Sequence, residues 1–565
     1  MAFKIKKNSS RFCLLFTLIT AIPVHAQDLS ELNKSEPFTI SGSAGLTSSF
    51  YSASGIPDRQ APFAYGIHAN ATMTLYGIAM PFSFTWYNNS KVGFSQPFNQ
   101  FGISPKYRWL TLHLGYRNLS FSEFTLSGYT FLGAGIEASP GRFRIGAMYG
   151  KFNQNSVYDL AMADSMPKMT RTGWAAKLGY GSEKRFVDLS VLRIGDDPKG
   201  YDTLNIEPGI PAPEQNIALG LTSRFDISEK LTFRFDGSYS FYTFNRAFAA
   251  TGISDDALLR LAGNFIRVNS TSEYFKALKT SISYSFSQGT VTGIEYRRID
   301  PGFRSMGSYF FNNDIEHLTI NQSLALLKNK INLRGSLGAQ RDNLKGAKEH
   351  TALRIIGSLT GNYNINQNWA VDATFNNFST NQRVFRTATD QSLLIYQVNR
   401  TITLSPRYMN AGEKMSHMAM LNINVTALED KNQSTSDMTE TETYMAMLIY
   451  NLGLLQLKMN ISAGLNYTMM LNKNFENRLA GGNINVAKTL LRDQLSLGLN
   501  NNLMINRIND DKGLILNSAL TAAWRFHPKH SLSLNLNLIN NRFAEGSAVP
   551  TYHEIRGDFG YAFTF

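Results

Sequence analysis

Hydrophobic and polar residues alternate along most of this chain. From 457 to 468 the odd positions hold Leu, Met, Ile, Ala, Leu and Tyr, and the even positions hold Lys, Asn, Ser, Gly, Asn and Thr. Leucine recurs at 532, 534, 536 and 538 with Ser or Asn between, and similar runs cover 110–117 and 231–241. Successive side chains of a strand point to opposite faces, so this period of two predicts strands with one apolar and one polar face.

The length of these runs separates two readings, a soluble β-sandwich with one wet face and a barrel with a lipid-facing exterior. Many runs extend over roughly ten to sixteen residues, which exceeds the usual strand of a globular sheet and suffices to cross a bilayer at a tilt. The pattern therefore favours an all-β fold, a transmembrane antiparallel β-barrel.

The connections between runs alternate between short and long. Short turns are predicted at 76–77, 108–109, 139–141, 182–184, 228–230, 287–289, 328–330, 366–368, 451–453, 492–493 and 527–529. Longer polar loops are predicted at 88–99, 153–170, 195–214, 247–271, 300–312, 342–348, 379–389, 429–439 and 544–550. Short periplasmic turns and longer external loops are typical of outer-membrane barrels. The count is about 26 strands, or 24 if one hairpin within 389–430 or near Asn472 is misread.

The last twelve residues are apolar on one side and charged on the other. Ile555, Phe559, Tyr561, Phe563 and Phe565 share one parity, and Glu554, Arg556, Asp558 and Thr564 share the other. This segment resembles the closing strand of a Gram-negative outer-membrane β-barrel, and the Tyr-, Phe- and Asn-rich strands resemble barrels of the Bacteroidota kind. The resemblance implies that Phe559, Tyr561, Phe563 and Phe565 form a C-terminal assembly signal for the barrel-assembly machinery.

The N-terminus predicts export through the general secretory route. Four basic residues precede an apolar core from Phe12 to Val24, and Val24-His25-Ala26 offers a small-residue cleavage site. We therefore expect residues 1–26 to be a cleaved signal peptide, 27–35 a short periplasmic leader and 36–565 a single barrel domain. The only cysteine, Cys13, lies in the signal, so the mature chain has no disulfide and no thiol ligand.

Net charge adds little to this picture. The formal charge of the whole chain is +13, but clustered Lys/Arg runs and a helical reading element are missing, so nucleic acid is not an expected partner. Outer-membrane lipid is the expected environment, and membrane or periplasmic proteins are the other candidate partners.

The two faces of the strands predict different roles. Aromatic residues near strand ends, such as Trp86, Tyr149, Tyr180 and Trp524, suggest two interfacial girdles. On the opposite face, parity directs charged side chains into the lumen. The basic ones are Arg117, Arg142, Arg144, Lys177, Arg224, Arg234, Arg297, Arg334, Arg354, Lys458, Arg525 and Arg556, and the acidic ones are Asp188, Asp236, Glu295, Asp372, Glu554 and Asp558. The basic excess either favours anionic solutes or is absorbed in cross-strand pairs that stiffen the wall.

The loop 247–271 contains a candidate helix. Ser254 is the expected cap, Asp255 and Asp256 suit the first turn, and leucines at 258, 259 and 261 form an apolar stripe. This segment would constrict the lumen, cap the barrel, receive a partner or pack against its own rim.

The sequence contains few motifs that indicate a catalytic or metal-binding site. The chain shows no HExxH, GxSxG or P-loop motif, and its histidines are scattered, with His113 and His317 the conceivable members of a Ser/His/Asn site. We expect no enzyme activity, no cofactor and no metal, and there is no room before 36 for a folded plug domain. The leading hypothesis is a porin-like channel for small polar or anionic solutes. The alternative is a non-catalytic barrel subunit of an outer-membrane complex for protein insertion, secretion or surface display.

Overall fold

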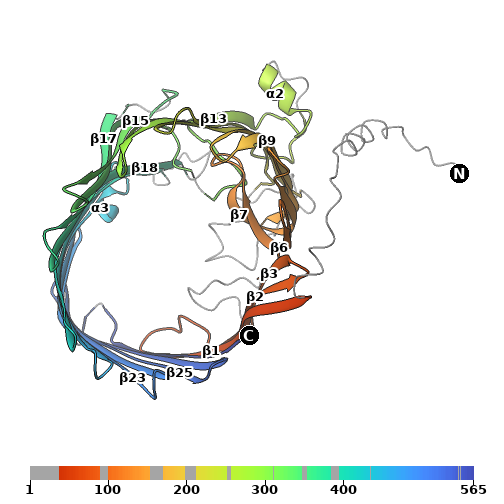
Figure 1. Cartoon of the computed structure of the whole chain (residues 1–565). Helices are drawn as coiled ribbons and strands as arrows, with labels where there is room; N and C mark the ends of the chain where they lie inside the picture. Colours follow the sequence, from red (N-terminus) through yellow and green to blue (C-terminus); the bar gives the residue numbers. More distant parts are fainter. Residues whose placement is uncertain are drawn as a thin grey trace.

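The strands close into one antiparallel barrel. The computed structural model describes residues 37–88, 100–152, 170–197, 212–250, 256–309, 311–346, 351, 353–383, 394–432, 434–544, 546–547 and 549–565, with the backbone alone for 380–383 and 394–396. The predicted signal peptide and leader lie outside the described residues. Figure 1 shows a ring of strands viewed along its axis.

The first half of the wall runs from β1 to β13. Its strands are β1 (Phe38–Ser54), β2 (Phe63–Leu75), β3 (Ile78–Tyr87), β4 (Gln100–Ile103), β5 (Lys106–Tyr107), β6 (Leu110–Ser120), β7 (Ser127–Ala138), β8 (Phe143–Phe152), β9 (Arg171–Ser182), β10 (Arg185–Asp196), β11 (Gln215–Asp226), β12 (Leu231–Thr243) and β13 (Ser272–Ser287). The short strands β4 and β5 both lie between β3 and β6. They are two pieces of one wall strand, interrupted at Ser104 and Pro105.

The second half runs from β14 to β27. Its strands are β14 (Thr290–Ile299), β15 (Ile315–Leu326), β16 (Ile331–Arg341), β17 (Leu353–Asn364), β18 (Trp369–Arg383), β19 (Leu394–Ala411), β20 (Met415–Asp430), β21 (Thr441–Leu454), β22 (Met459–Asn472), β23 (Phe475–Leu490), β24 (Leu495–Ile508), β25 (Asp511–His527), β26 (His530–Phe543) and β27 (Tyr552–Thr564). Counting β4 and β5 as one, the barrel has 26 strands, which confirms the larger predicted count. The passage 389–430, where the sequence left the strand count open, contains β19 and β20.

The first and last strands close the sheet. β1 pairs with β27 in antiparallel register from Ser43 opposite Thr564 to Ser54 opposite His553. The backbone of Phe565 extends this ladder, since its N–H donates to Gly42 O and its C=O accepts from Gly42 N, at 3.0 and 2.9 Å. Because the sheet closes on itself, the backbone N–H and C=O groups of the first and last strands are hydrogen-bonded, as strands surrounded by lipid require.

Two details of the predicted connections are wrong. The turn expected at 451–453 lies at 455–458, because β21 continues to Leu454. The alternation of short turns and long loops is also incomplete. At the loop end, β22 and β23 are joined by residues 473–474 and β24 and β25 by 509–510, so these hairpins are short at both ends.

The outer face of the wall is apolar and exposed. On β22, Leu465 is 64% and Tyr467 41% exposed, whereas Asn466 between them is only half-exposed. The same parity on other strands presents Leu189, Leu337 and Ile484 outward. Aromatic residues follow this face near both strand ends, with Trp524 and Phe526 at the turn end and Tyr149 at the loop end. A band of this kind matches a hydrocarbon environment.

Helix α2 (Ala257–Ala262) lies outside the ring (Figure 1). Its buried contacts are with outward-facing residues of β11 and β12, Ile217 and Phe241. The segment thus packs against its own rim. Its cap is Asp256, which accepts from the N–H groups of Leu258 and Leu259. The expectation that Ser254 caps the helix is wrong, since the helix begins three residues later and a carboxylate already satisfies its first donors.

Candidate functional site: the barrel lumen

The inner face carries most of the charged residues that parity predicted there. Those that lie on strands, opposite the exposed apolar positions, are Arg117, Arg144, Lys177, Arg224, Arg234, Arg297, Arg334, Arg354, Arg525, Arg556, Asp188, Asp236, Glu295, Asp372, Glu554 and Asp558. Two predicted residues do not lie in the wall. Arg142 belongs to the turn before β8, and Lys458 to the turn before β22, where it pairs with Asp493 at 2.6 Å. Parity continued past the strand ends placed both incorrectly.

Many lumenal charges are paired. The ion pairs are Arg144–Asp188 (2.8 Å), Arg224–Asp226 (3.0 Å), Arg297–Glu123 (2.5 Å), Arg354–Asp342 (3.3 Å), Arg407–Asp372 (3.7 Å), Lys279–Glu295 (4.0 Å) and Arg556–Asp558 (3.1 Å). Much of the lumenal charge is therefore neutralised in ion pairs, some within one strand, some between strands and some to loop residues. Five inward basic residues make no ion pair with any described residue: Arg117, Lys177, Arg234, Arg334 and Arg525.

Two chain segments fold inward and pack against part of the wall. One connects β6 to β7 and includes Phe121, Phe124 and Leu126, and the other connects β14 to β15 and includes Phe303 and Met306. They bury inward-facing residues of β6–β15 in the main hydrophobic cluster of the molecule, with Phe124 and Phe303 edge to face at 5.9 Å. We call these segments, 121–126 and 300–314, the lumenal loops.

Polar contacts tie the lumenal loops to each other and to the wall. Ser305 donates to Thr125 O at 2.6 Å, and the Ser127 N–H donates to Gly307 O at 2.9 Å. Asn216 of β11 accepts from the Met306 N–H at 3.2 Å. Sequence analysis missed the first loop, because a six-residue connection next to a strand carries no periodic signal. The aromatic residues of this connection were the sequence feature that could have indicated a packed loop.

Glu123 anchors the first lumenal loop electrostatically. Its carboxylate contacts Arg297 at 2.5 Å and Lys279 at 3.2 Å. Asp236 accepts from the Ser122 hydroxyl at 2.7 Å and from the Glu123 N–H at 3.1 Å. The predicted lumenal residues Asp236 and Arg297 thus both contact Glu123, which parity did not include, and Glu295 is joined to it through Lys279 at 4.0 Å.

A second buried network of polar side chains links the loop ends of β9, β10 and β12 to the residue before β11. Arg171 forks onto Asp196 at 2.8 and 3.0 Å and reaches Glu214 at 3.4 Å. Tyr242 donates to Glu214 at 2.7 Å. Glu214 lies just before β11, and burial raises the pKa of its carboxyl. This bidentate arrangement fixes the loop ends of β9–β12.

The other side of the lumen is neutral and rich in asparagine. The inward positions of β21–β24 and β26 contain no Asp, Glu, Lys or Arg. Their asparagines are Asn451, Asn460, Asn466, Asn472, Asn477, Asn483, Asn485, Asn500, Asn502, Asn506, Asn535, Asn537 and Asn541. Asn483, Asn502 and Asn517 lie side by side on β23, β24 and β25. The amide oxygens of Asn502 and Asn517 are buried in this row and accept no hydrogen bond from a described residue.

His113 belongs to a chain of polar side chains beside the break between β4 and β5. Its Nδ1 lies 3.1 Å from the Ser104 hydroxyl and its Nε2 lies 3.2 Å from Glu137. The order Ser–His–Glu matches that of acyl-transfer sites. However, the Ser104 N–H already donates to Pro81 O at 2.9 Å, and residue 105 is a proline without an N–H. The two backbone donors that would most directly form an oxyanion hole are therefore taken or missing.

The other candidate histidine, His317, lies 3.8 Å from Glu295. Within the part of the chain that the structure describes, no three His, Cys, Asp or Glu side chains are grouped so as to hold a metal ion. No described helix is long and apolar enough to cross a membrane.

Comparison with known proteins finds only distant similarities. No protein-family model and no curated protein matches the chain. Similar solved structures include the translocation pore of the P pilus usher PapC (11% identity, 93% of this chain and 99% of that chain, TM-score 0.39). Others are OccK9 of Pseudomonas aeruginosa (11%, 93% and 98%, 0.30) and the FrpB iron transporter of Neisseria meningitidis (11%, 95% and 83%, 0.38). These similarities carry no argument about function. In architecture the chain is a β-barrel of the outer-membrane kind, as its closing strand predicted.

Proposed function

We propose that this protein is a porin-like channel for small polar solutes in the outer membrane of a Gram-negative bacterium of the Bacteroidota kind. The observation that carries the proposal is the one-sided filling of the lumen. The lumenal loops bury residues of β6–β15, while the inward positions of β21–β24 and β26 carry asparagines and no ionised residue. A barrel of this strand number encloses more space than its wall side chains fill, and a polar lining favours water in that space.

The channel is proposed to prefer anions. The five inward basic residues without an ion pair leave a positive excess on the wall, and a wall of one sign raises the local concentration of counter-ions. The preference is modest, because the charges are spread over a wide circumference and form no narrow ring.

Planar-bilayer recording tests this proposal. The purified full-length barrel is expected to give large, stable conductance steps, and a salt gradient is expected to give a reversal potential of the sign for anion preference. The variant Arg234→Gln/Arg334→Gln is expected to reduce that potential while leaving the step size nearly unchanged. Absence of conductance contradicts the channel function, and cation preference contradicts the charge argument alone.

A second candidate function is a non-catalytic subunit of an outer-membrane protein complex. The observation in its favour is the outer surface of the α2 segment, where Leu261 is 55% and Phe265 50% exposed. Purification from native envelopes in mild detergent discriminates the two. A silent barrel with stoichiometric protein partners supports the complex, and a conducting barrel without partners supports the channel.

Biogenesis is proposed to follow the outer-membrane route. Residues 1–26 would be removed on secretion, and the assembly machinery would recognise the terminal strand through Phe559, Tyr561, Phe563 and Phe565. The support is the position of β27 as the strand that closes the barrel. Mass spectrometry of the mature protein tests the cleavage, which is expected to leave Gln27 as the first residue.

A further inference from the structure

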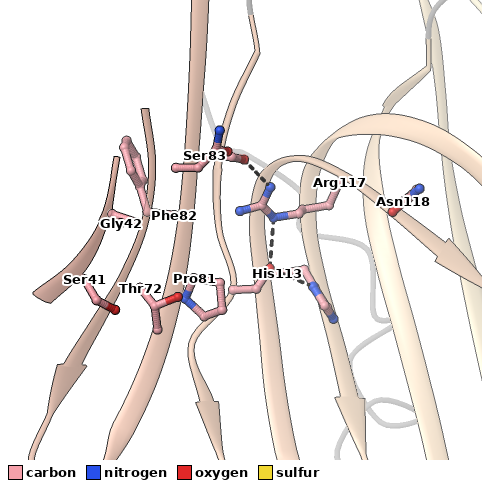
Figure 2. Close-up of a pocket in the computed structure, with 12 residues that line it drawn as sticks. Ser41, Gly42, Thr72, Pro81, Phe82, Ser83, His113, Arg117 and Asn118 are labelled. Carbon is pink, nitrogen blue, oxygen red and sulfur yellow. Dashed lines mark hydrogen bonds between the residues drawn. The ribbon is translucent and has the colours of Figure 1, made fainter. Parts of the chain in front are cut away.

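A recess opens on the inner face where the fourth wall strand is broken. It has a volume of about 630 Å³ and is lined by residues of β1–β3 and β6, together with Ser104 at the break. Figure 2 shows Arg117 and His113 on one side of it and Ser41, Thr72 and Pro81 on the other. We propose that this recess binds a hydroxylated carboxylate of about the size of a hexuronic acid. This proposal goes beyond the channel function and does not depend on conduction.

Arg117 supplies the cationic end of the site. Its Nε donates to the Ser104 hydroxyl at 2.9 Å, and its Nη1 donates to the Ser83 hydroxyl at 2.9 Å and to Tyr116 O at 3.2 Å. These partners are neutral, and no described carboxylate forms an ion pair with Arg117. The Nη2 group makes no hydrogen bond to a described residue. The two N–H groups of Nη2 are thus left to donate charge-assisted hydrogen bonds to an anionic oxygen of a ligand.

A relay of side chains fixes the orientation of Arg117. Ser104 accepts from Arg117 and can donate to His113 Nδ1, while the opposite nitrogen of the imidazole can donate to Glu137. Glu137 is thereby hydrogen-bonded to His113, with two side chains between it and Arg117, and it does not neutralise the guanidinium directly. Ser104 and His113 are positioning residues in this arrangement, since both act on the ligand through Arg117.

The guanidinium also depends on a glycine beneath it. A Cβ added at Gly102 would lie 2.6 Å from Arg117 Cζ and 2.7 Å from its Nη1. Any larger side chain at 102 must therefore displace the guanidinium from its present position. This contact gives a way to disturb the site without changing its charge.

The rest of the recess provides hydrogen-bonding groups for hydroxyls. Ser41, Asn70, Thr72 and Asn118 line it, and none of these side chains has a hydrogen-bond partner among the described residues. Amides and hydroxyls both donate and accept, as sugar hydroxyls require. The ring of Pro81 adds an apolar surface. One cationic group with free donors, several neutral polar groups and a volume well above that of acetate together favour a sugar acid over a simple anion or a neutral sugar.

Isothermal titration of the full-length barrel in detergent micelles tests the site. Glucuronate is the probe, and glucose and acetate are the comparison ligands. Wild type is expected to bind glucuronate at least tenfold more tightly than either. Arg117→Gln is expected to lose glucuronate affinity by about tenfold to a hundredfold, because a charge-assisted hydrogen bond is lost. Gly102→Val is expected to cause a similar loss with the charge retained.

Arg334→Gln is the matched control, since it removes one unpaired lumenal arginine outside the recess. It is expected to bind glucuronate as wild type does. Each variant is first shown to be folded by the difference in gel mobility between boiled and unboiled samples. The proposal is overturned if folded Arg117→Gln retains wild-type glucuronate affinity, or if glucose binds wild type as tightly as glucuronate. Conductance is recorded on the same samples, so failure of the channel function shows separately.

Discussion

At the scale of single residues, the inner wall depends on carboxylates that the barrel buries. Asp188 is only 3% exposed, and Arg144 forks onto it at 2.8 and 3.0 Å while lying over the ring of Phe186 at 4.0 Å. Gly179 leaves room for the carboxylate, since a Cβ there would lie 1.9 Å from Asp188 Oδ1. Removing one partner of such a pair leaves an unpaired charge in a poorly hydrated place.

The variant Arg144→Gln is therefore expected to lower the free energy of unfolding by about 3 kcal/mol, the cost of stranding a buried carboxylate. The double variant Arg144→Gln/Asp188→Asn is expected to recover most of that loss. Urea titration of the barrel in detergent, followed by tryptophan fluorescence, measures both. Equal stability of the single and double variants would show that Asp188 is adequately solvated without Arg144.

Sequence reasoning identified many of the lumenal residues but few of their partners. Parity along a strand assigns Arg144 to a face without any knowledge of register. Its partner Asp188 lies on β10, two strands away, and only the closed sheet brings the two together. The same limit applies to Arg117, because no local pattern reveals the three neutral partners that occupy its Nε and Nη1 and leave Nη2 free.

At the scale of elements, the lumenal loops are the least regular part of the structure and the best packed. Gly307 lies where they meet, and a Cβ there would lie 2.7 Å from Thr125 O and 2.8 Å from Leu192 Cδ2. Backbone groups cannot move aside there as a flexible side chain would. The close approach of the two loops therefore requires glycine at this position.

Gly307→Val is expected to undock the 300–314 loop from the wall and to increase single-channel current noise, since a loosened loop samples the lumen. Ser308→Val is the control, because Ser308 is only half-buried beside the contact. The measurement is the current variance of single open channels at fixed voltage. Equal variance in the two variants would mean that the loops do not border the conducting path.

The α2 segment is expected to contact the membrane interface. Leu261 and Phe265 are exposed beside a rim whose outward residues Arg193 and Lys276 are basic, and amphipathic segments of this composition lie at the headgroup level. A polarity-sensitive dye attached at Leu261→Cys is expected to shift its emission to the blue on transfer from detergent-free denaturant into bilayers. Attachment at Gly546→Cys, in the loop before β27, is expected to report water. Identical emission at the two sites contradicts an interfacial α2.

At the scale of the whole molecule, closure depends on the last residues of the chain. β27 pairs with both β26 and β1, so its loss exposes two strand edges to lipid, and each unpaired backbone group there costs several kcal/mol. Removal of residues 555–565 is expected to abolish the heat-modifiable form on gels.

The terminal side chain is expected to matter differently from the terminal backbone. Phe565→Ala keeps the backbone bonds to Gly42, so it is expected to refold in detergent as wild type does and to reach the outer membrane of cells at a reduced level. Quantification of the protein in isolated outer membranes provides the second measurement. Normal levels in cells would argue against the assembly signal.

The fold was largely predictable because a barrel repeats one rule. Each strand alternates two faces, and each face keeps the same environment around the whole circumference. An error in predicting one turn therefore leaves the prediction of the other strands unchanged. The misplaced turn at 451–453 shows such an error: Asn451, Leu452 and Gly453 have turn composition, yet they pair with β20 and β22. Long-range pairing overrode local propensity there.

The uneven lining of the lumen has a consequence for anything that passes through it. The inward positions of β21–β24 and β26 carry amides and no ionised group, whereas ionised groups line much of the remaining wall. The electric field of the interior therefore points across the passage instead of along it. A dipolar molecule in transit would be turned by that field and drawn off axis, so orientation would be imposed by the two unlike walls without any narrow ring of charge.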